Sequence, residues 1–297
     1  MVMELDVKPG KYVVAVSGGL DSVALLHLLV SAARTRQITL VVAHFEHGIR
    51  ADSDQDRLLV QELAETYGLP FVYARGHLGP GASEATARAA RYDFLKKVQA
   101  AHAADAIMTA HHQDDHLETA LINLLRGTGG RGLGGVRSEG GLLRPLLPFT
   151  KQQLREYAAR HNLQWREDST NADERYLRNY LRRRVVPTFT PAARQQLLQH
   201  INAAAELHAA IEQELAPWTS GRELDRAWFT TLPYDVSAEA MALWLRRNGL
   251  YFDRKTIHRL TVFAKTAAPG KRADVGAGHM LAASKNHITL GVRPAKG

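Results

Sequence analysis

The chain of 297 residues is long enough for two domains, and its 45% hydrophobic and 23% charged residues are typical of a soluble globular protein. The absence of cysteine excludes disulfides, thiolate metal sites, iron–sulfur clusters and cysteine nucleophiles. The sequence shows neither an apolar run of membrane-spanning length nor a basic-then-apolar leader, so we expect a cytoplasmic protein.

The formal net charge of +8 is distributed unevenly along the chain. Residues 218–297 carry 13 Lys and Arg against six Asp and Glu, which leaves the first 217 residues close to neutral. A strongly basic final part is typical of proteins that bind a polyanion, although a basic surface that serves only solubility would have the same composition.

The first half of the sequence alternates between apolar, mostly β-branched runs and amphipathic stretches. We predict strands over 11–16, 38–45, 70–75, 106–111 and 142–147. We predict helices over 22–36, 52–67, 84–102, 114–126 and 151–162. This order predicts an α/β fold, in which a parallel sheet carries helices on both faces. Ligands of such sheets bind at the carboxyl ends of the strands.

The second half has a different pattern. Its predicted elements are one long helix, two shorter helices and two strands, over 192–215, 238–248, 254–264, 273–277 and 287–292. We therefore expect a first domain over 1–190, a helical linker over 191–216 and a smaller, basic α+β domain over 217–297.

The first predicted strand runs into the hexapeptide Ser17-Gly18-Gly19-Leu20-Asp21-Ser22 at the start of a helix. The glycines let the backbone approach an anion, and the free N–H groups of the helix start, with both serine hydroxyls, can bond phosphate oxygens. The spacing fits neither a Walker loop nor a dinucleotide-binding fingerprint. Asp21 would repel phosphates unless a divalent cation lay between them, which implies Mg²⁺. An ordinary capped turn would explain the serines but not the glycines.

Two further polar stretches lie near predicted strand ends. His44–Arg50 follows the second strand and offers two histidines and an arginine to a nucleotide. On the helix that begins at Glu84, Arg88 and Arg91 lie three residues apart and share a face. A polar loop and solvated arginines are the simpler interpretations of the two stretches taken singly. Their position beside the glycine loop favours the nucleotide.

At the end of the fourth predicted strand, the eight residues His111–Glu118 contain three histidines and three carboxylates. Asp115 and Glu118 lie three apart in the first turn of a helix, so both can face one point. They can bind Mg²⁺ or hold an ammonium such as the amine of lysine, and a metal-dependent phosphohydrolase also stays open. Helix capping explains acidic residues in a first turn, but not this number of them.

Two arginine-rich segments follow. Arg126–Val136 combines six glycines with Arg126 and Arg131, and is as typical of a flexible surface loop as of a lid over a substrate. Residues 175–184 contain five arginines interleaved with tyrosine. This composition suits RNA phosphates and bases, while a helix with a solvated basic face is the alternative.

Together these motifs resemble those of the tRNA(Ile)-lysidine synthetase family, within the superfamily of N-type ATP pyrophosphatases. The matching segments are Ser17–Ser22, His44–Arg50, Glu84–Tyr92, Ala110–Thr119, Arg126–Gly135 and Glu167–Arg182. The resemblance covers residues 11 to about 190 closely and the basic tail more loosely. Two positions depart from the family pattern: Glu46 stands where Asn or Asp is usual, and Thr170 interrupts a Ser-Asn pair.

The resemblance implies ATP-dependent ligation of L-lysine to C2 of the wobble cytidine of an isoleucine tRNA with a CAU anticodon. The reaction would pass through an adenylated cytidine and release AMP and pyrophosphate. The resemblance further implies that the catalytic residues are Asp21, Arg91, His111, Asp115 and Glu118, and that Asp21 and Asp115 bind Mg²⁺. It implies that ATP is bound by Ser17, Gly18, Gly19, Leu20, Asp21, Ser22, His44, Arg88 and Arg91. It implies that tRNA is bound by Arg126, Arg131, Arg178, Arg182, Arg183, Arg246 and Arg247.

Other functions stay open at this point. A tRNA thiolase would need cysteines, which the chain lacks. Another tRNA-modifying enzyme of the superfamily, the phosphohydrolase and a non-catalytic RNA-binding module are the alternatives. Whether the protein is a monomer or a homodimer is equally open.

Overall fold

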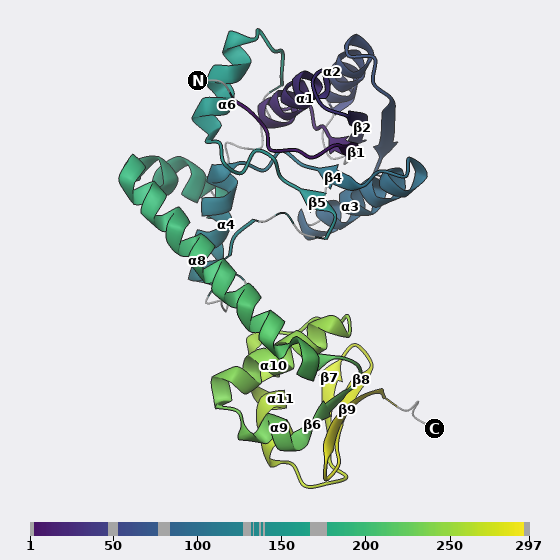
Figure 1. The fold of residues 1–297 in the computed structure, drawn as a ribbon, viewed down its shortest axis with the longest axis vertical. Coiled ribbons are helices and arrows are strands. Elements are labelled where there is room, and N and C mark those ends of the chain that lie inside the picture. Colours follow the sequence, from purple (N-terminus) through teal and green to yellow (C-terminus); the bar gives the residue numbers. More distant parts are fainter. Residues whose placement is uncertain are drawn as a thin grey trace. The chain divides into compact units, whose positions relative to one another are not determined.

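The computed structural model describes residues 3–46, 53–76, 84–126, 132, 134–136, 138, 140–166 and 177–293. The chain forms two compact units, Met1–Ala204 and Ala205–Gly297 (Figure 1). The boundary between them falls within one helix, α8 (Pro191–Leu215).

A five-stranded parallel sheet forms the centre of the first unit. Its strands are β1 (Gly10–Ala15), β2 (Ile38–Glu46), β3 (Phe71–Arg75), β4 (Ala106–Met108) and β5 (Leu142–Leu143). They lie in the order β3-β2-β1-β4-β5, and every neighbouring pair is parallel. The predicted strand over 142–147 is therefore too long. Pro145 has no backbone N–H for the ladder, which limits β5 to two residues.

The described helices of the first unit follow the predicted alternation. They are α1 (Leu20–Ala33), α2 (Ser53–Thr66), α3 (Glu84–Ala101), α4 (Gln113–Leu125), α6 (Lys151–Arg160), α7 (Leu177–Tyr180) and the beginning of α8. A π-helical turn, Leu181–Val185, continues α7 and leads into the short 3₁₀ helix Val186–Thr188. Helix α6 begins with a capping box, in which Thr150 accepts a hydrogen bond from the N–H of Gln153, and Gln153 from that of Thr150.

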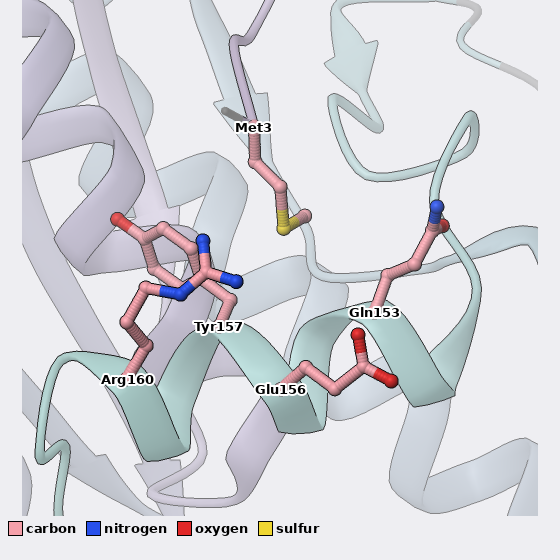
Figure 2. A pocket seen from close by; sticks show the side chains of 5 residues that line it. All are labelled: Met3, Gln153, Glu156, Tyr157 and Arg160. Carbon is pink, nitrogen blue, oxygen red and sulfur yellow. The ribbon is translucent and has the colours of Figure 1, made fainter. Parts of the chain in front are cut away.

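Between α6 and the N-terminal segment lies a small pocket, lined by Met3, Gln153, Glu156, Tyr157 and Arg160 (Figure 2). Its volume of about 50 Å³ is little more than the space that one water molecule occupies in the liquid. It is far too small for a nucleotide, and none of the predicted site residues lines it.

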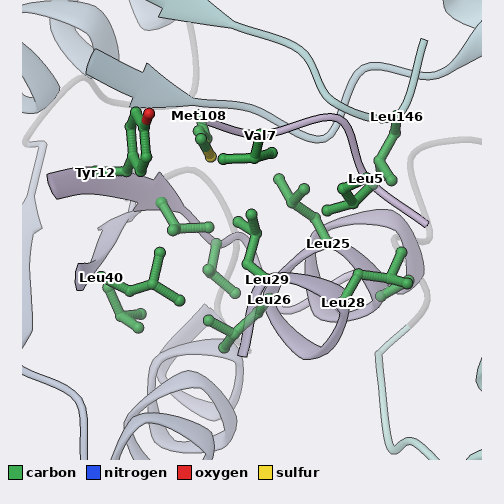
Figure 3. Packing of buried hydrophobic residues seen from close by; sticks show 14 of the residues in the cluster. Leu5, Val7, Tyr12, Leu25, Leu26, Leu28, Leu29, Leu40, Met108 and Leu146 are labelled. Atoms are coloured by element: carbon green, nitrogen blue, oxygen red, sulfur yellow. The ribbon is translucent and has the colours of Figure 1, made fainter. Parts of the chain in front are cut away.

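Helices cover both faces of the sheet, as predicted. Successive strand residues point to opposite faces, so Val13 and Val14 of β1 join different clusters. Val14 belongs to the cluster that contains the leucines of α1 and Leu154 of α6. Figure 3 shows Leu25, Leu26 and Leu29 of α1 in this cluster. Val13 packs on the other face with Leu95 and its neighbours on α3. The α/β fold class is thereby confirmed.

The second unit is a small α+β fold, also as predicted. Its antiparallel sheet has the order β6-β9-β8-β7, from β6 (Glu223–Asp225), β7 (Arg272–Gly276), β8 (His279–Ala283) and β9 (His287–Val292). Its helices are α9 (Arg226–Thr231), α10 (Tyr234–Arg247) and α11 (Arg254–Thr266). Trp244 is fully buried in this core, and its indole N–H donates to Gly221 O at 2.9 Å. Among the described helices of both units, none combines the length and apolarity that crossing a bilayer requires.

We expect Leu26→Ala to lower the free energy of unfolding by about 2–5 kcal/mol, because Leu26 is fully buried and its truncation leaves a cavity. The matched control is Leu58→Ala on α2, whose side chain is 54% exposed and which should change stability by at most about 0.5 kcal/mol. Urea unfolding of the two variants measures both values. Equal losses would contradict the assignment of the core.

Candidate active site

The strand order creates a topological switch point at β1. The chain proceeds from β1 to β2 and β3 on one side, and then adds β4 and β5 on the other side. Ligands of open α/β sheets bind in the crevice beyond the carboxyl ends of the strands at such a point. Ser17–Ser22 follows β1 and His111–Glu118 follows β4, so the fold brings the two strongest motifs to one crevice.

The hexapeptide Ser17–Ser22 forms a tight turn that is held by its own hydroxyls. Ser22 Oγ accepts from the N–H of Ser17 at 3.1 Å, lies 3.1 Å from Ser17 Oγ and donates to Gly19 O at 2.9 Å. Gly18 has a φ of 91°, which favours glycine, and its carbonyl accepts from the N–H of Arg166 at 3.0 Å. The buried Leu20 anchors the start of α1 in the core.

His44, at the end of β2, is buried behind this turn. Its Nδ1 lies 2.8 Å from Val16 O, a carbonyl that can only accept, so Nδ1 carries the proton and Nε2 is an acceptor. Burial lowers the pKa of His44, which keeps the ring neutral at pH 7. Among the described residues Nε2 has no hydrogen-bond partner. A donor group on a bound ligand would satisfy it.

Glu46, one of the two departures from the family pattern, has partners of its own on β3. Its buried carboxylate accepts from the hydroxyl of Tyr73 at 2.7 Å and lies 3.1 Å from Nε of Arg75. A carboxylate at this position is thus neutralised and bonded within the sheet edge.

His112 is the centre of the site. Its imidazole is only 3% exposed and contacts three carboxylates: Nε2 lies 3.7 Å from Asp21 and 3.4 Å from Asp115, and Nδ1 lies 3.7 Å from Asp114. Burial alone would lower the pKa of His112, but Asp21 and Asp115 outweigh burial and raise it. His112 is also the N-cap residue of α4, and its backbone N–H donates to the carboxylate of Asp115 at 3.1 Å.

Cations from distant segments neutralise these carboxylates. Lys151 Nζ, at the start of α6, lies 2.7 and 2.6 Å from the two oxygens of Asp21. Arg194 of α8 pairs with Asp114. Burial by itself would raise the pKa of Asp21, but His112 and Lys151 lower it to about 2.

Arg182 forms a clamp on the two remaining carboxylates. Its guanidinium holds both oxygens of Glu118, at 2.7 and 2.8 Å, and one oxygen of Asp115 at 2.9 Å. Glu118 is fully buried, and this burial raises its pKa although Arg182 opposes the rise. Asp21, Asp114, Asp115 and Glu118 thus face Lys151, Arg194 and Arg182, and Nε of Arg178 lies 3.9 Å from Glu118 as a further cation.

The carboxylate oxygens of Asp21 and Asp115 are donors that fit Mg²⁺. Asp21 and Asp115 approach the same imidazole nitrogen, and Mg²⁺ is commonly held by one or two carboxylates together with substrate phosphates. No three His, Asp or Glu side chains of the described residues are grouped as a complete metal site.

Arg88 and Arg91 of α3 both lie close to the ring of Tyr92. Their guanidinium carbons are 4.9 and 5.5 Å from the centre of its ring. His111 Nδ1 contacts Thr109 Oγ1 at 2.9 Å. Burial, with the nearby arginines, lowers the pKa of His111 to about 4 although Asp115 opposes this, so the ring is neutral at pH 7.

The described part of the glycine-rich segment and Arg178 contact α4. Arg126 is exposed at the end of α4, and His116 Nδ1 accepts from the N–H of Val136 at 3.0 Å. Arg178 donates to Thr119 at 2.9 Å, and Arg183 is exposed. Several predicted residues lie outside the described part of the chain, namely Arg131, His47–Arg50 and Glu167–Tyr176.

The two predicted arginines of the second unit make internal contacts. Arg246 pairs with Glu212 at 3.1 Å, and Arg247 donates to Ala216 O at 2.8 Å. Part of the positive charge of this unit therefore serves its own fold.

Sequence reasoning missed the central role of His112 and the cations Lys151 and Arg194. A signal was present at Lys151, because a cation in the first turn of a helix conflicts with the helix dipole. Such a local conflict is expected at functional sites. His112 lay within the recognised motif but is indistinguishable there from His111, and nothing in the sequence pairs Arg194 with Asp114.

Comparison with known proteins shows the family of the chain. A family model described as a PP-loop domain matches residues 2–189. The chain is 42% identical over 211 residues to a tRNA(Ile)-lysidine synthase of Thermus thermophilus, covering 68% of this chain and 41% of that protein. It is 37% identical over 257 residues to the tRNA(Ile)-lysidine synthase of Alkalilimnicola ehrlichii, covering 80% of this chain and 57% of that protein. It is 38% identical over 207 residues to the tRNA(Ile)-lysidine synthase of Chlorobaculum tepidum, covering 67% of this chain and 62% of that protein. The chain spans about half the length of these curated relatives.

Among solved structures, a U34-tRNA thiolase from Methanococcus maripaludis, solved with its iron–sulfur cluster, superposes with a TM-score of 0.56. The superposition covers 67% of this chain and 74% of that chain at 14% identity, which shows a shared fold.

We expect Arg182→Met to lower the free energy of unfolding by about 3 kcal/mol, because it removes the hydrogen-bonded cation of the buried Glu118 and leaves Arg178, at 3.9 Å, as its nearest cation. Adding Glu118→Gln should recover part of the lost stability, because it removes the negative charge of the buried carboxylate. Urea unfolding of the single and double variants measures the coupling. The control is Asp93→Asn, which breaks the exposed pair of α3 with Lys97 and should cost at most about 0.5 kcal/mol. A loss for Arg182→Met no larger than the control would contradict the clamp.

The low pKa of Asp21 predicts a contribution to acid unfolding. Since its pKa in the folded protein is about 2, against an ordinary value of 3.8, its stabilisation is complete above about pH 4 and is lost as the pH falls through 2. Unfolding free energies measured between pH 5 and pH 2 should therefore fall less steeply for Asp21→Asn than for the wild type. Identical slopes would show that the ion pair with Lys151 does not form in solution.

Proposed function

The chain belongs to the PP-loop domain family, and from this premise we propose that it is a tRNA(Ile)-lysidine synthase. In this proposal it uses ATP to join the ε-amine of L-lysine to C2 of the wobble cytidine of an isoleucine tRNA with a CAU anticodon. We place the reaction in the cytoplasm, where ATP and tRNA meet. The observation that carries the proposal is the convergence of Asp21, from the phosphate loop, and Asp115, from α4, on His112 at the switch point.

The first step would adenylate the cytidine. Ser17, Gly18, Gly19 and Ser22 bind the phosphates of ATP, and Asp21 with Asp115 holds Mg²⁺, which when bound neutralises phosphate charge. The O2 of the cytidine attacks the α-phosphorus, and the bond to pyrophosphate breaks. Arg88 and Arg91 stabilise the negative charge that develops on the phosphates. The adenylated base is then electrophilic at C2.

The second step would transfer lysine. In this proposal the carboxylates of Asp115 and Glu118 hold the ammonium of lysine and orient its side chain. The neutral ring of His111 accepts one proton from this ammonium. The resulting free amine attacks C2, the C2–O bond breaks, AMP leaves, and the product keeps the remaining protons of the amine.

The second unit would bind the tRNA, because its net charge is strongly positive. Within the first unit, Arg126, Arg178 and Arg183 lie on α4 and on the segment that packs beside it, which suits contact with the anticodon arm. Arg131, Arg246 and Arg247 remain candidates by charge. The alternative of a metal-dependent phosphohydrolase has less support, because it gives no role to the phosphate loop Ser17–Ser22.

The test is the release of AMP and pyrophosphate from ATP with Mg²⁺, lysine and an isoleucine tRNA that bears CAU. We expect lysine to enter this tRNA as AMP appears, a methionine tRNA to remain unmodified, and Asp21→Ala to lower the rate by at least about 100-fold. AMP formation without lysine transfer would mean that the acceptor is wrong. Absence of any α–β cleavage by folded wild type would overturn the proposal.

A further inference from the structure

Lys151 joins two parts of the site that are far apart in the sequence. Its ammonium contacts both oxygens of Asp21, across 130 residues, at 2.7 and 2.6 Å. Within the described part of the chain, Asp21 is the one partner of this ammonium. An ammonium has three donors, so two are used here and one is available.

The backbone of Lys151 is fixed, while its head group is accessible. The N–H of Lys151 donates to Asp114 at 2.7 Å, and the capping box of Thr150 and Gln153 sets the start of α6. The side chain of Lys151 is 42% exposed, against 26% for that of Asp21. A rigid base with a four-carbon stem lets the charge change partners over a short distance without movement of the helix.

Two cations compete for the carboxylate of Asp21. In the free protein its carboxylate is neutralised by Lys151, and in the presence of a nucleotide the same carboxylate is suited to Mg²⁺. A metal ion on Asp21 would displace the ammonium by like-charge repulsion, beside a loop built to hold phosphates. The position of a lysine at the start of α6, against the helix dipole, agrees with a role beyond stabilising the helix.

We propose that Lys151 is a phosphate-binding residue of this site. It neutralises Asp21 in the free protein and binds the β- and γ-phosphates of ATP once Asp21 is occupied by Mg²⁺. This inference rests on the proposed function in so far as ATP is the ligand. It is distinct from a purely structural ion pair, in which Lys151 would only hold Asp21 in place.

The experiment separates these roles by removing the carboxylate. Binding of ATP is measured by calorimetry in EDTA, without tRNA, for Asp21→Asn and for Asp21→Asn combined with Lys151→Met. In this background Lys151 has no carboxylate to hold, so a structural role predicts equal affinities. We expect the added Lys151→Met to weaken ATP binding by about tenfold or more, as for loss of a hydrogen bond to a charged group. Adenosine, which lacks phosphates, should bind both proteins equally.

The matched control is Lys97→Met in the same background, since Lys97 is an exposed lysine of α3 that pairs with Asp93. It should leave ATP affinity unchanged, and thermal unfolding of each variant shows that all are folded. Equal ATP affinity with and without Lys151, or an equal loss for ATP and adenosine, would overturn the inference. If the wild type binds no ATP in the presence of Mg²⁺, both the proposed function and the role of Lys151 are contradicted. If the wild type binds ATP but the variants do not differ, only the role of Lys151 is contradicted.

Discussion

The imidazole of His112 contacts carboxylates from two elements, Asp21 after β1 and Asp114 and Asp115 in α4, and buried charge of this density is stable only if it is balanced. The balance is supplied from outside the central sheet. Lys151 comes from α6, Arg182 from the turn after α7 and Arg194 from α8. The crevice at the switch point is therefore complete only when the chain beyond β5 has packed against α4, which makes the segment after residue 150 part of the site.

The same balance explains why α8 contributes to the first unit. Arg194 pairs with Asp114, and Ile201 packs with Leu117 and Ala120 of α4 in a small cluster of its own. The first part of this helix is thus held by one ion pair and by apolar contacts, while Leu215 near its end belongs to the core around Trp244. This one helix of 25 residues thus contributes side chains to the cores of both units.

How far the sequence predicted the structure differs between the sheet and the site. The parallel strands were predictable because both faces are buried and the runs around Val13 and Val41 are continuously apolar. Strand β8 was not predictable, because His279–Ala283 contains no β-branched residue. Its strand conformation is fixed by pairing with the neighbouring strands. The motif at His111–Glu118 was recognisable by composition, but its partners Lys151 and Arg194 are separated from it by dozens of residues. Ion pairs of that range are set by packing, which no local pattern encodes.

The hydrogen bond from Arg166 to Gly18 has an optical consequence. Arg166 N–H bonds the carbonyl of Gly18, and the preceding residue is Trp165, the one tryptophan of residues 1–204. The other three, Trp218, Trp228 and Trp244, all belong to the second unit. The tryptophan fluorescence of the first unit therefore originates from a single indole, and the residue after it, Arg166, is hydrogen-bonded to the backbone of the phosphate loop. We expect a rearrangement of that loop to change the emission of Trp165.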